Sequence, residues 1–168
     1  MVMVYLPNCV CCSSTIDFHS KTNIEIVRNM SHQTLTINTT GAGLYEFTHS
    51  VQSFIQSRQL QDGLLTVFVR HTSCSLVIQE NADPDVQRDL NAFFSRLVPP
   101  SDDPAMHYLV HTLEGPDDMP AHIKAALTQT SIGIPLIEGR MVLGTWQGRY
   151  LFEHRTRPHQ RQIVLNVS

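Results

Sequence analysis

Seven stretches of the chain carry the apolar pattern of β-strands, either alternating with polar residues or running continuously. In the first of them, Leu35 and Ile37 alternate with polar neighbours, as in a half-buried strand. Glu138-Gly139-Arg140 predicts a hairpin between two later strands, and Gln147-Gly148-Arg149 predicts a further turn. The seven stretches are residues 33–40, 64–70, 74–79, 132–137, 141–146, 150–155 and 161–168.

Three other stretches predict helices. One runs from Leu44 to about Arg58 at amphipathic spacing. Another starts at Asp83-Pro84-Asp85, where aspartate suits the N-cap and proline the first turn. A short one extends from Asp118 or Met119 to Leu127. The second helix carries an apolar stripe of Val86, Leu90, Phe93, Phe94 and Leu97. These elements predict an α+β fold, a mostly antiparallel, sandwich-like sheet of about seven strands with two or three helices.

The composition fits one globular domain and narrows the classes of partner. The 168 residues are 42% hydrophobic and 16% charged, so one substantial core is expected. A net charge of -3 provides no basic surface for nucleic acid. No apolar run has the length of a membrane-spanning helix, so we expect a protein that binds neither nucleic acid nor membrane.

The cysteines indicate reduced thiols, so we expect a cytoplasmic protein. Cys9, Cys11 and Cys12 are too close together to form a spaced zinc pair, and Cys74 lies alone in an apolar run, where it is expected in the core. Residues 1–29 have no sustained period and are interpreted as an N-terminal extension. Residues 30–168 are expected to form the single domain.

Histidines and carboxylates gather between residues 111 and 124. His111 and His122 bracket Glu114, Asp117 and Asp118, and a Gly-Pro turn between them can bring the two histidines together. A catalytic metal takes about three protein ligands and leaves one position open, so a third ligand would come from elsewhere. On spacing alone a second interpretation stays open, in which Asp118 caps the helix and His122 faces solvent.

Two further stretches contain polar groups suited to a pocket. His71, Ser73 and Ser75 lie between two apolar strands, but the surrounding sequence has no nucleophile-elbow motif and does not favour serine chemistry. Glu80 and Asn81 precede the second helix and offer a carboxylate and an amide. Residues 143–158 contain the single tryptophan and several arginines, and arginine suits phosphate.

These three stretches resemble the YjbQ-like family, also called the secondary thiamine-phosphate synthase family. The resemblance rests on HTSCSLVIQENADPDVQRDL, HTLEGPDDMPAHIKAAL and GRMVLGTWQGRYLFEHR, and it extends from about Met30 to the C-terminus. It implies a compact sandwich-like fold assembled as a homotrimer, a histidine-bound metal and weak thiamine-phosphate synthase activity. Two features depart from the family. Cys74 stands where alanine is usual, and residues 1–29 have no counterpart, which makes Met30 the expected native start.

The resemblance also implies roles for individual residues. The metal is expected to be divalent, with zinc first and magnesium or manganese as alternatives, and the substrate a small phosphorylated metabolite. The alternatives are a metal-dependent hydrolase of another phosphorylated metabolite and a non-enzymatic metal- or ligand-binding trimer. The expected metal ligands are His111 and His122, with His71 or His154 as the third; the expected catalytic residues are Glu80, His71 and Arg155; the expected substrate-binding residues are Asn81, Asp118, Trp146 and Gln147.

Overall fold

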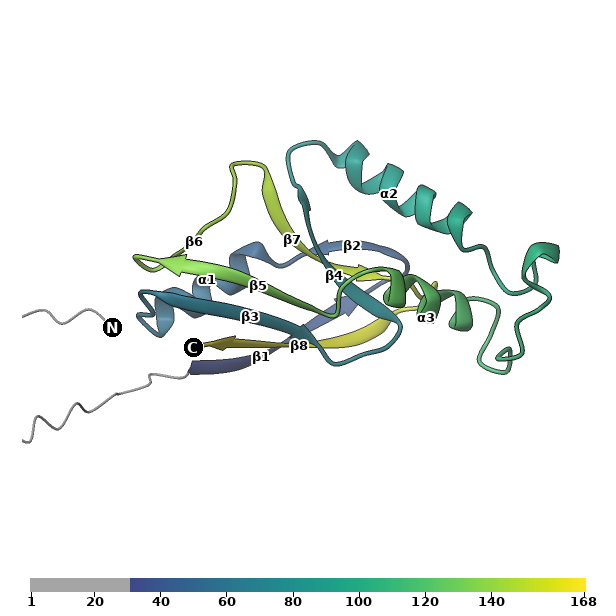
Figure 1. Ribbon diagram of the computed structural model, residues 1–168, viewed down its shortest axis with the longest axis horizontal. Helices are drawn as coiled ribbons and strands as arrows, with labels where there is room; N and C mark the ends of the chain where they lie inside the picture. The colour runs from purple at the N-terminus through teal and green to yellow at the C-terminus, as the bar shows by residue number, and fades with distance from the viewer. Residues whose placement is uncertain (1–30) are drawn as a thin grey trace, which may run out of the picture.

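The computed structural model describes residues 31–168. The expectations for the N-terminal extension, its three cysteines and a start at Met30 concern residues outside that part. Within residues 31–168, eight strands form two antiparallel sheets around a shared core (Figure 1). Three α-helices and one short 3-10 helix complete this part of the chain. The structure confirms the α+β class that the sequence predicts.

The larger sheet has five strands in the order β1-β8-β3-β5-β6. Its pattern is clearest in β5, where Ile132, Ile134 and Leu136 are buried and the residues between them are exposed. Such alternation is typical of an antiparallel sheet with one face on the core. The strands are β1 (Ser31–Thr39), β3 (Gly63–Val69), β5 (Ser131–Ile137), β6 (Arg140–Met141) and β8 (His159–Val167).

The smaller sheet has three strands, β2 (Gly43–Glu46), β7 (Gln147–Glu153) and β4 (Cys74–Glu80), with β7 in the centre. On one face of β7, Leu151 joins the core between the sheets, and Cys74 of β4 is buried there as predicted. On the other face, the ring of Phe152 meets the edge of Phe94 at 5.3 Å between centroids. Because both faces are covered, β7 is buried from its second residue onward.

Three α-helices and a 3-10 helix accompany the sheets within residues 31–168, and the first helix contributes three side chains to the shared core. Helix α1 (Thr48–Ser57) buries Val51, Phe54 and Ile55 in it. Helix α2 (Pro84–Leu97) starts as predicted, with the Asp83 carboxylate accepting the Asp85 N–H at 2.9 Å. The 3-10 helix η1 (Pro104–Met106) and helix α3 (Asp118–Leu127) follow. None of these helices is long and apolar enough to cross a membrane.

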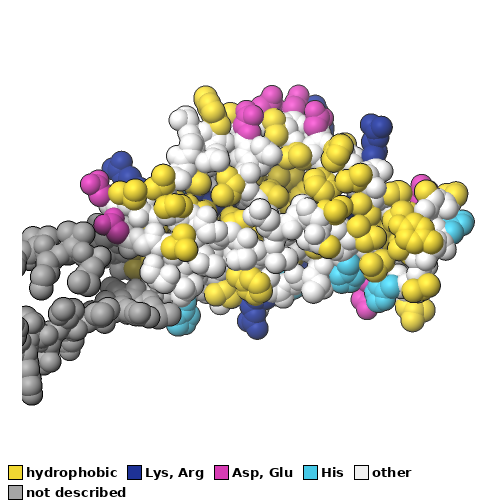
Figure 2. Space-filling model, in the orientation of Figure 1, with side chains coloured by type: hydrophobic (Ala, Val, Ile, Leu, Met, Phe, Trp, Pro, Cys, Tyr) yellow, Lys and Arg dark blue, Asp and Glu magenta, His cyan; other side chains and the backbone are white. Residues whose placement is uncertain are grey.

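The apolar stripe of α2 is largely left uncovered by the described chain. No residue of this helix is buried, and the Phe93 and Leu97 side chains are 59% and 54% exposed. The segment after α2 adds Tyr108, Val110 and Leu113, all more exposed still. Figure 2 shows hydrophobic side chains gathered over this part of the visible face. We call Phe93, Leu97, Tyr108, Val110 and Leu113 the exposed apolar group.

Three local predictions are wrong. The helix predicted from Leu44 starts at Thr48, because residues 43–46 pair with β7 as strand β2. The strand predicted over 141–146 is reduced to β6, which ends at Met141. The turn predicted at Gln147-Gly148-Arg149 lies inside β7. There Gly148 serves close packing, since an added Cβ would lie 2.9 Å from Asn81, Glu46 and Tyr150 side-chain atoms.

A buried ion pair joins the ends of β7 and β8. The Arg161 guanidinium donates from Nε and Nη2 to the two oxygens of Glu153, at 2.7 and 2.6 Å, and both side chains are almost fully buried. Thr39 of β1 donates to the same carboxylate at 2.9 Å. Burial alone would raise the pKa of Glu153, but these bonds outweigh it and lower that pKa. The pair therefore ties the two sheets together through strong, fully satisfied contacts.

We expect Glu153→Gln to lower the free energy of unfolding by about 3 kcal/mol or more, because it leaves the Arg161 charge buried without a counter-ion. The matched control is Arg88→Met, which removes the Arg88–Asp85 pair, whose side chains are 73% and 58% exposed. That control should cost less than about 1 kcal/mol. Chemical denaturation of both variants measures the difference, and equal losses would contradict the assignment.

Candidate functional site

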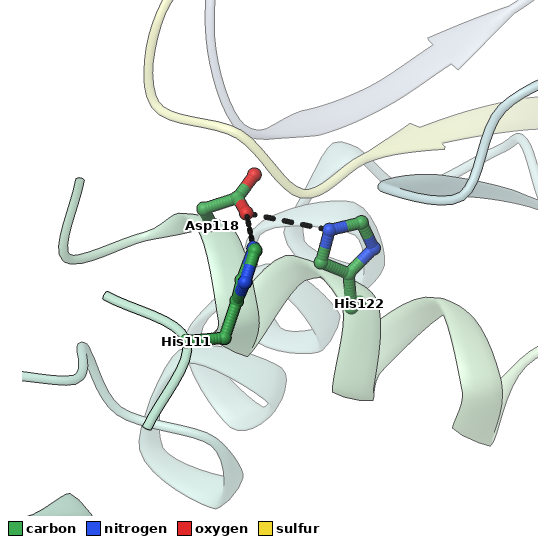
Figure 3. A group of neighbouring side chains, drawn as sticks. All are labelled: His111, Asp118 and His122. Carbon is green, nitrogen blue, oxygen red and sulfur yellow. Dashed lines mark hydrogen bonds and ion pairs between the residues drawn. The ribbon is translucent and has the colours of Figure 1, made fainter. Parts of the chain in front are cut away.

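Three of the expected site residues converge at the start of α3. His111 precedes the helix, and Asp118 and His122 lie four residues apart on one of its faces (Figure 3). The Nε2 atoms of His111 and His122 lie 2.8 and 3.3 Å from Oδ2 of Asp118. The three ligand atoms all lie within 4.8 Å of one another, so the structure forms a compact His-Asp-His cluster.

The backbone of the β3–β4 connection fixes the orientation of His122. Its Nδ1 lies 2.9 Å from the carbonyl oxygen of Thr72, which can only accept a hydrogen bond. Nδ1 therefore carries the hydrogen, and in a neutral imidazole Nε2 presents its lone pair. That lone pair faces a carboxylate oxygen, a repulsive arrangement unless a proton or a metal ion lies between them.

The other oxygen of Asp118 is held by Arg155. The guanidinium also donates from Nε to Asp117 Oδ2 at 3.1 Å and from Nη2 to the Glu114 carbonyl at 3.0 Å. Asp118 itself is only 2% exposed, so Arg155 supplies the charge that compensates this buried carboxylate. The contacts of Arg155 thus make it a support of the cluster, with its donors directed at protein acceptors.

Asp117 completes this support. Burial raises the pKa of its carboxyl, but hydrogen bonds from the Thr156 N–H and hydroxyl and from Arg155 outweigh it, and the pKa falls to about 2. Asp117 is therefore ionised at neutral pH and fixes the chain just after β7. Sequence reasoning placed Asp117 among the acids of the loop without a partner, and nothing in the pattern identified Thr156.

His71 lies outside the cluster. Its Nε2 accepts the backbone N–H of Gln162 at 2.8 Å, so the ring is anchored to β8, an inner strand of the larger sheet. Burial and then the nearby charge of Arg161 lower the pKa of His71. This histidine is therefore neutral at pH 7, and its neighbour Thr72 is the part of the segment that touches the cluster.

His154, the other expected third ligand, is buried next to Ser75. Its Nε2 lies 2.9 Å from the Ser75 hydroxyl, and its ring rests against Phe152 at 4.5 Å between centroids. Burial, reinforced by the charge of Lys124, lowers the pKa of His154 to about 3. Within residues 31–168 the third member of the cluster is thus Asp118, which the sequence analysis assigned to substrate binding.

The remaining expected site residues gather at the opposite end of the smaller sheet. Glu80 pairs with Gln147 in the β4–β7 register, and the Asn81 N–H donates to the Trp146 carbonyl at 3.0 Å. Gln147 and Glu153 are six positions apart in β7, which corresponds to about 20 Å of strand. In one chain, the group formed by Glu80, Asn81, Trp146 and Gln147 therefore lies far from the His-Asp-His cluster.

Comparison with known proteins identifies the family. The family model described as UPF0047 protein YjbQ-like matches residues 33–168. A UPF0047 protein of Synechocystis is 54% identical over 134 residues, which cover 80% of this chain and 88% of the relative. The UPF0047 protein YjbQ of Escherichia coli O157:H7 is 38% identical over 137 residues, covering 81% and 96%.

Solved structures agree with these sequence matches. A conserved protein of the YjbQ/UPF0047 family from Clostridium acetobutylicum superposes with a TM-score of 0.71 at 31% identity, covering 81% of this chain and 99% of that one. A protein of Aeropyrum pernix superposes with a TM-score of 0.73 at 25% identity, covering 82% and 98%. Sequence and structure together show that the chain belongs to the YjbQ-like UPF0047 family.

Proposed function

We propose that His111, Asp118 and His122 bind a divalent metal ion, with zinc as the first candidate and magnesium or manganese as alternatives. The observation that carries this proposal is the contact of His122 Nε2 with the Asp118 carboxylate while Nδ1 is committed to Thr72. Two imidazoles and a carboxylate are a donor set that zinc accepts. At zinc bond lengths of about 2.0–2.2 Å, tetrahedral ligands lie about 3.3–3.6 Å apart. The His122–Asp118 separation of 3.3 Å matches this spacing, and His111, at 2.8 Å from Asp118, would move outward by about 0.5 Å to admit the ion.

The exposure of the cluster favours a catalytic metal over a structural one. The side chains of His111 and His122 are 47% and 32% exposed, whereas Asp118 is buried behind them. Three protein ligands with one side open to solvent leave room for water or substrate, as in catalytic zinc sites. A structural ion would be expected in a closed set of four protein ligands.

The activity that we propose is a weak thiamine-phosphate synthesis, which the family resemblance implies. In this reaction the thiazole nitrogen displaces pyrophosphate from an aminopyrimidine-methyl pyrophosphate, and a bound divalent ion would stabilise the departing negative charge. Within the chain, Arg155 holds Asp118 in place, Thr72 orients His122, and the carboxylate of Glu80 suits hydrogen bonding to the aminopyrimidine. These roles rest on the contacts described above and on residue chemistry.

Metal binding can be tested by elemental analysis of purified protein. We expect near-stoichiometric divalent metal in the wild type and a loss of at least tenfold in affinity for His111→Ala combined with His122→Ala, because two of three ligands are removed. His107→Ala is the control, since His107 is an exposed histidine in the same segment outside the cluster. A wild type that stays metal-free after reconstitution would refute the metal proposal.

Activity can be tested with the metal-loaded full chain and the two thiamine precursors. Thiamine-phosphate formation should fall at least about a hundredfold in Asp118→Asn, because the carboxylate that joins both histidines and Arg155 loses its charge. Phosphate release from a panel of phosphorylated metabolites serves as the comparison. Phosphate release without thiamine phosphate would replace the synthase proposal with the hydrolase; neither product, with metal bound, would leave a binding protein.

We also propose that the chain assembles as the homotrimer that the resemblance implies. The exposed apolar group supports this, because apolar side chains gathered on one face commonly mark a contact surface. Assembly also gives a reason for the separation between the His-Asp-His cluster and the group around Glu80, which lie at opposite ends of β7, a strand of about 20 Å. In a trimer, these two halves of the expected site come from neighbouring chains.

Subunit complementation tests this arrangement. His111→Ala and Glu80→Ala chains carry defects in different halves, so we expect each to be inactive alone and their co-expressed mixture to regain a measurable part of the activity. Light scattering on the wild type gives the number of chains directly. A monomer in solution would contradict the proposal, and so would a trimer whose mixed form regains no activity.

A further inference from the structure

A cavity with several polar lining residues lies towards the other end of β7 from Arg155. It has a volume of about 660 Å³ and is open to solvent between the start of α1 and strands β6 and β7. Arg149, six residues before Arg155 in the chain, contributes to its wall. Arg149 lies four strand positions before the end of β7 at Glu153, about 13 Å along the strand, and no cavity residue belongs to the His-Asp-His cluster, so the cavity is separate from that cluster. Its polar lining residues include Glu46, Thr48, His49, Ser50, Arg140 and Arg149.

Arg149 is a buried cation with an unused hydrogen-bonding edge. Its side chain has no exposed surface, yet Nε and Nη2 have no hydrogen-bond partner within residues 31–168. In the described part of the chain, Nη1 is the one guanidinium nitrogen of Arg149 with a hydrogen-bond contact, to the sulfur of Met141. Leaving a buried charged donor unsatisfied costs more than leaving a neutral one, so an arginine in this state indicates that an acceptor belongs beside it.

Arg161 shows what the same edge binds elsewhere in this protein. There Nε and Nη2 donate in parallel to the two oxygens of Glu153, at 2.7 and 2.6 Å. This is the side-on, bidentate geometry that a guanidinium forms with a carboxylate or a phosphate. Arg149 lines the cavity and leaves the same pair of donors without an acceptor among residues 31–168, so the matching two-oxygen acceptor would come from a ligand.

The start of α1 adds donors to the same cavity. Thr48, His49 and Ser50 form the first turn of a ten-residue helix and line the cavity wall. The N-cap residue, Phe47, makes no side-chain cap hydrogen bond, and the first turn contains no acidic residue. First-turn N–H groups lack intrahelical acceptors and carry the positive end of the helix dipole, which favours an anion.

Two arginines and one glutamate line the cavity, so its net charge is positive. Arg140 lies on the rim, and Glu46 is the carboxylate of the lining. Burial lowers the pKa of Arg149 to about 10, against the opposing influence of Glu46. Arg149 therefore stays charged at neutral pH. The backbone ties the parts together, since Arg149 N–H donates to the Thr48 hydroxyl at 2.9 Å and Phe47 N–H to the Arg149 carbonyl at 3.0 Å.

We propose that this cavity binds the oxoanion group, phosphate or carboxylate, of a small metabolite. Nε and Nη2 of Arg149 donate hydrogen bonds to two oxygens of the group. The first-turn N–H groups of α1 stabilise its remaining negative charge. The cavity volume accommodates a small molecule attached to that group. The proposal is independent of the metal site, because none of the cavity residues belongs to the His-Asp-His cluster.

The test is calorimetric titration of the full chain with inorganic phosphate and, separately, with acetate, at constant ionic strength set by chloride. Arg149→Met keeps the length of the side chain and removes both donors, so we expect the affinity for the bound oxoanion to fall at least tenfold. Glu46→Gln removes the opposing carboxylate and should raise the affinity several-fold. The matched control is Arg96→Met, an exposed arginine at the end of α2 that should leave the affinity unchanged.

Three outcomes decide the question. Binding of phosphate or acetate that is lost in Arg149→Met and strengthened in Glu46→Gln supports the site, and the preferred anion identifies the class of ligand. Binding that is the same in Arg149→Met and Arg96→Met, or absent from the wild type for both anions, overturns it. The double variant His111→Ala with His122→Ala should bind the anion like the wild type, which keeps this result apart from any failure of the metal proposal.

Discussion

The position of the candidate site depends on the buried ion pair between Glu153 and Arg161. The carboxylate of Glu153 lies at the end of β7, fully buried, and neutralises Arg161 of the larger sheet. The same carboxylate accepts the backbone N–H groups of His154 and Arg155 at 3.1 and 3.0 Å. It therefore fixes the backbone just after β7, and this backbone conformation directs the Arg155 side chain to Asp117 and Asp118. The ion pair between the sheets thus positions Arg155, which in turn supports the His-Asp-His cluster near the surface.

The His-Asp-His cluster joins three separate parts of the chain, each held by a polar contact. Arg155 holds Asp118 from the β7 side, Thr72 holds His122 from the β3–β4 connection, and Asp118 itself receives His111. Because Asp118 is almost inaccessible while both histidines reach solvent, the buried acid acts as an anchor and the imidazoles form the open side. Such a layered arrangement resembles the second-sphere support that orients ligands in metalloproteins.

The sequence predicted this molecule best where a pattern reports on local packing. Alternation in residues 131–137 and the Asp83 cap are local features, and both appear as expected. It failed where pairing between distant segments decides the outcome. Residues 43–46 have helical spacing but pair with β7 instead, and Gly148 marks a close approach of neighbouring side chains where a turn was predicted. Tertiary pairing overrides local preference in such segments.

For the site, the turn and the helix between His111 and His122 predicted that the two histidines can converge, but spacing alone left open the alternative in which His122 faces solvent. It could not find the Thr72 carbonyl, because a backbone acceptor has no sequence signature. Nor could it choose between His71 and His154, whose partners come from other strands. Arg149 was noted among the arginines suited to phosphate, but its position on the core face of a strand was not. A strand alternates its faces, so Arg149 shares a face with core residue Leu151, and a charge at such a position calls for a partner.

Strand β7 links the two proposed sites through a single rigid element. Arg149 near its start and Glu153 at its end point to the same face, because residues two and four apart in a strand share one. Glu153 finds its counter-charge inside the protein, in Arg161, and the bonds around it are complete. Arg149 has the complementary donors and no such acceptor among residues 31–168. The same face of one strand thus carries a charge satisfied by the fold and a charge that the fold leaves for a ligand. That contrast separates a structural arginine from a binding one.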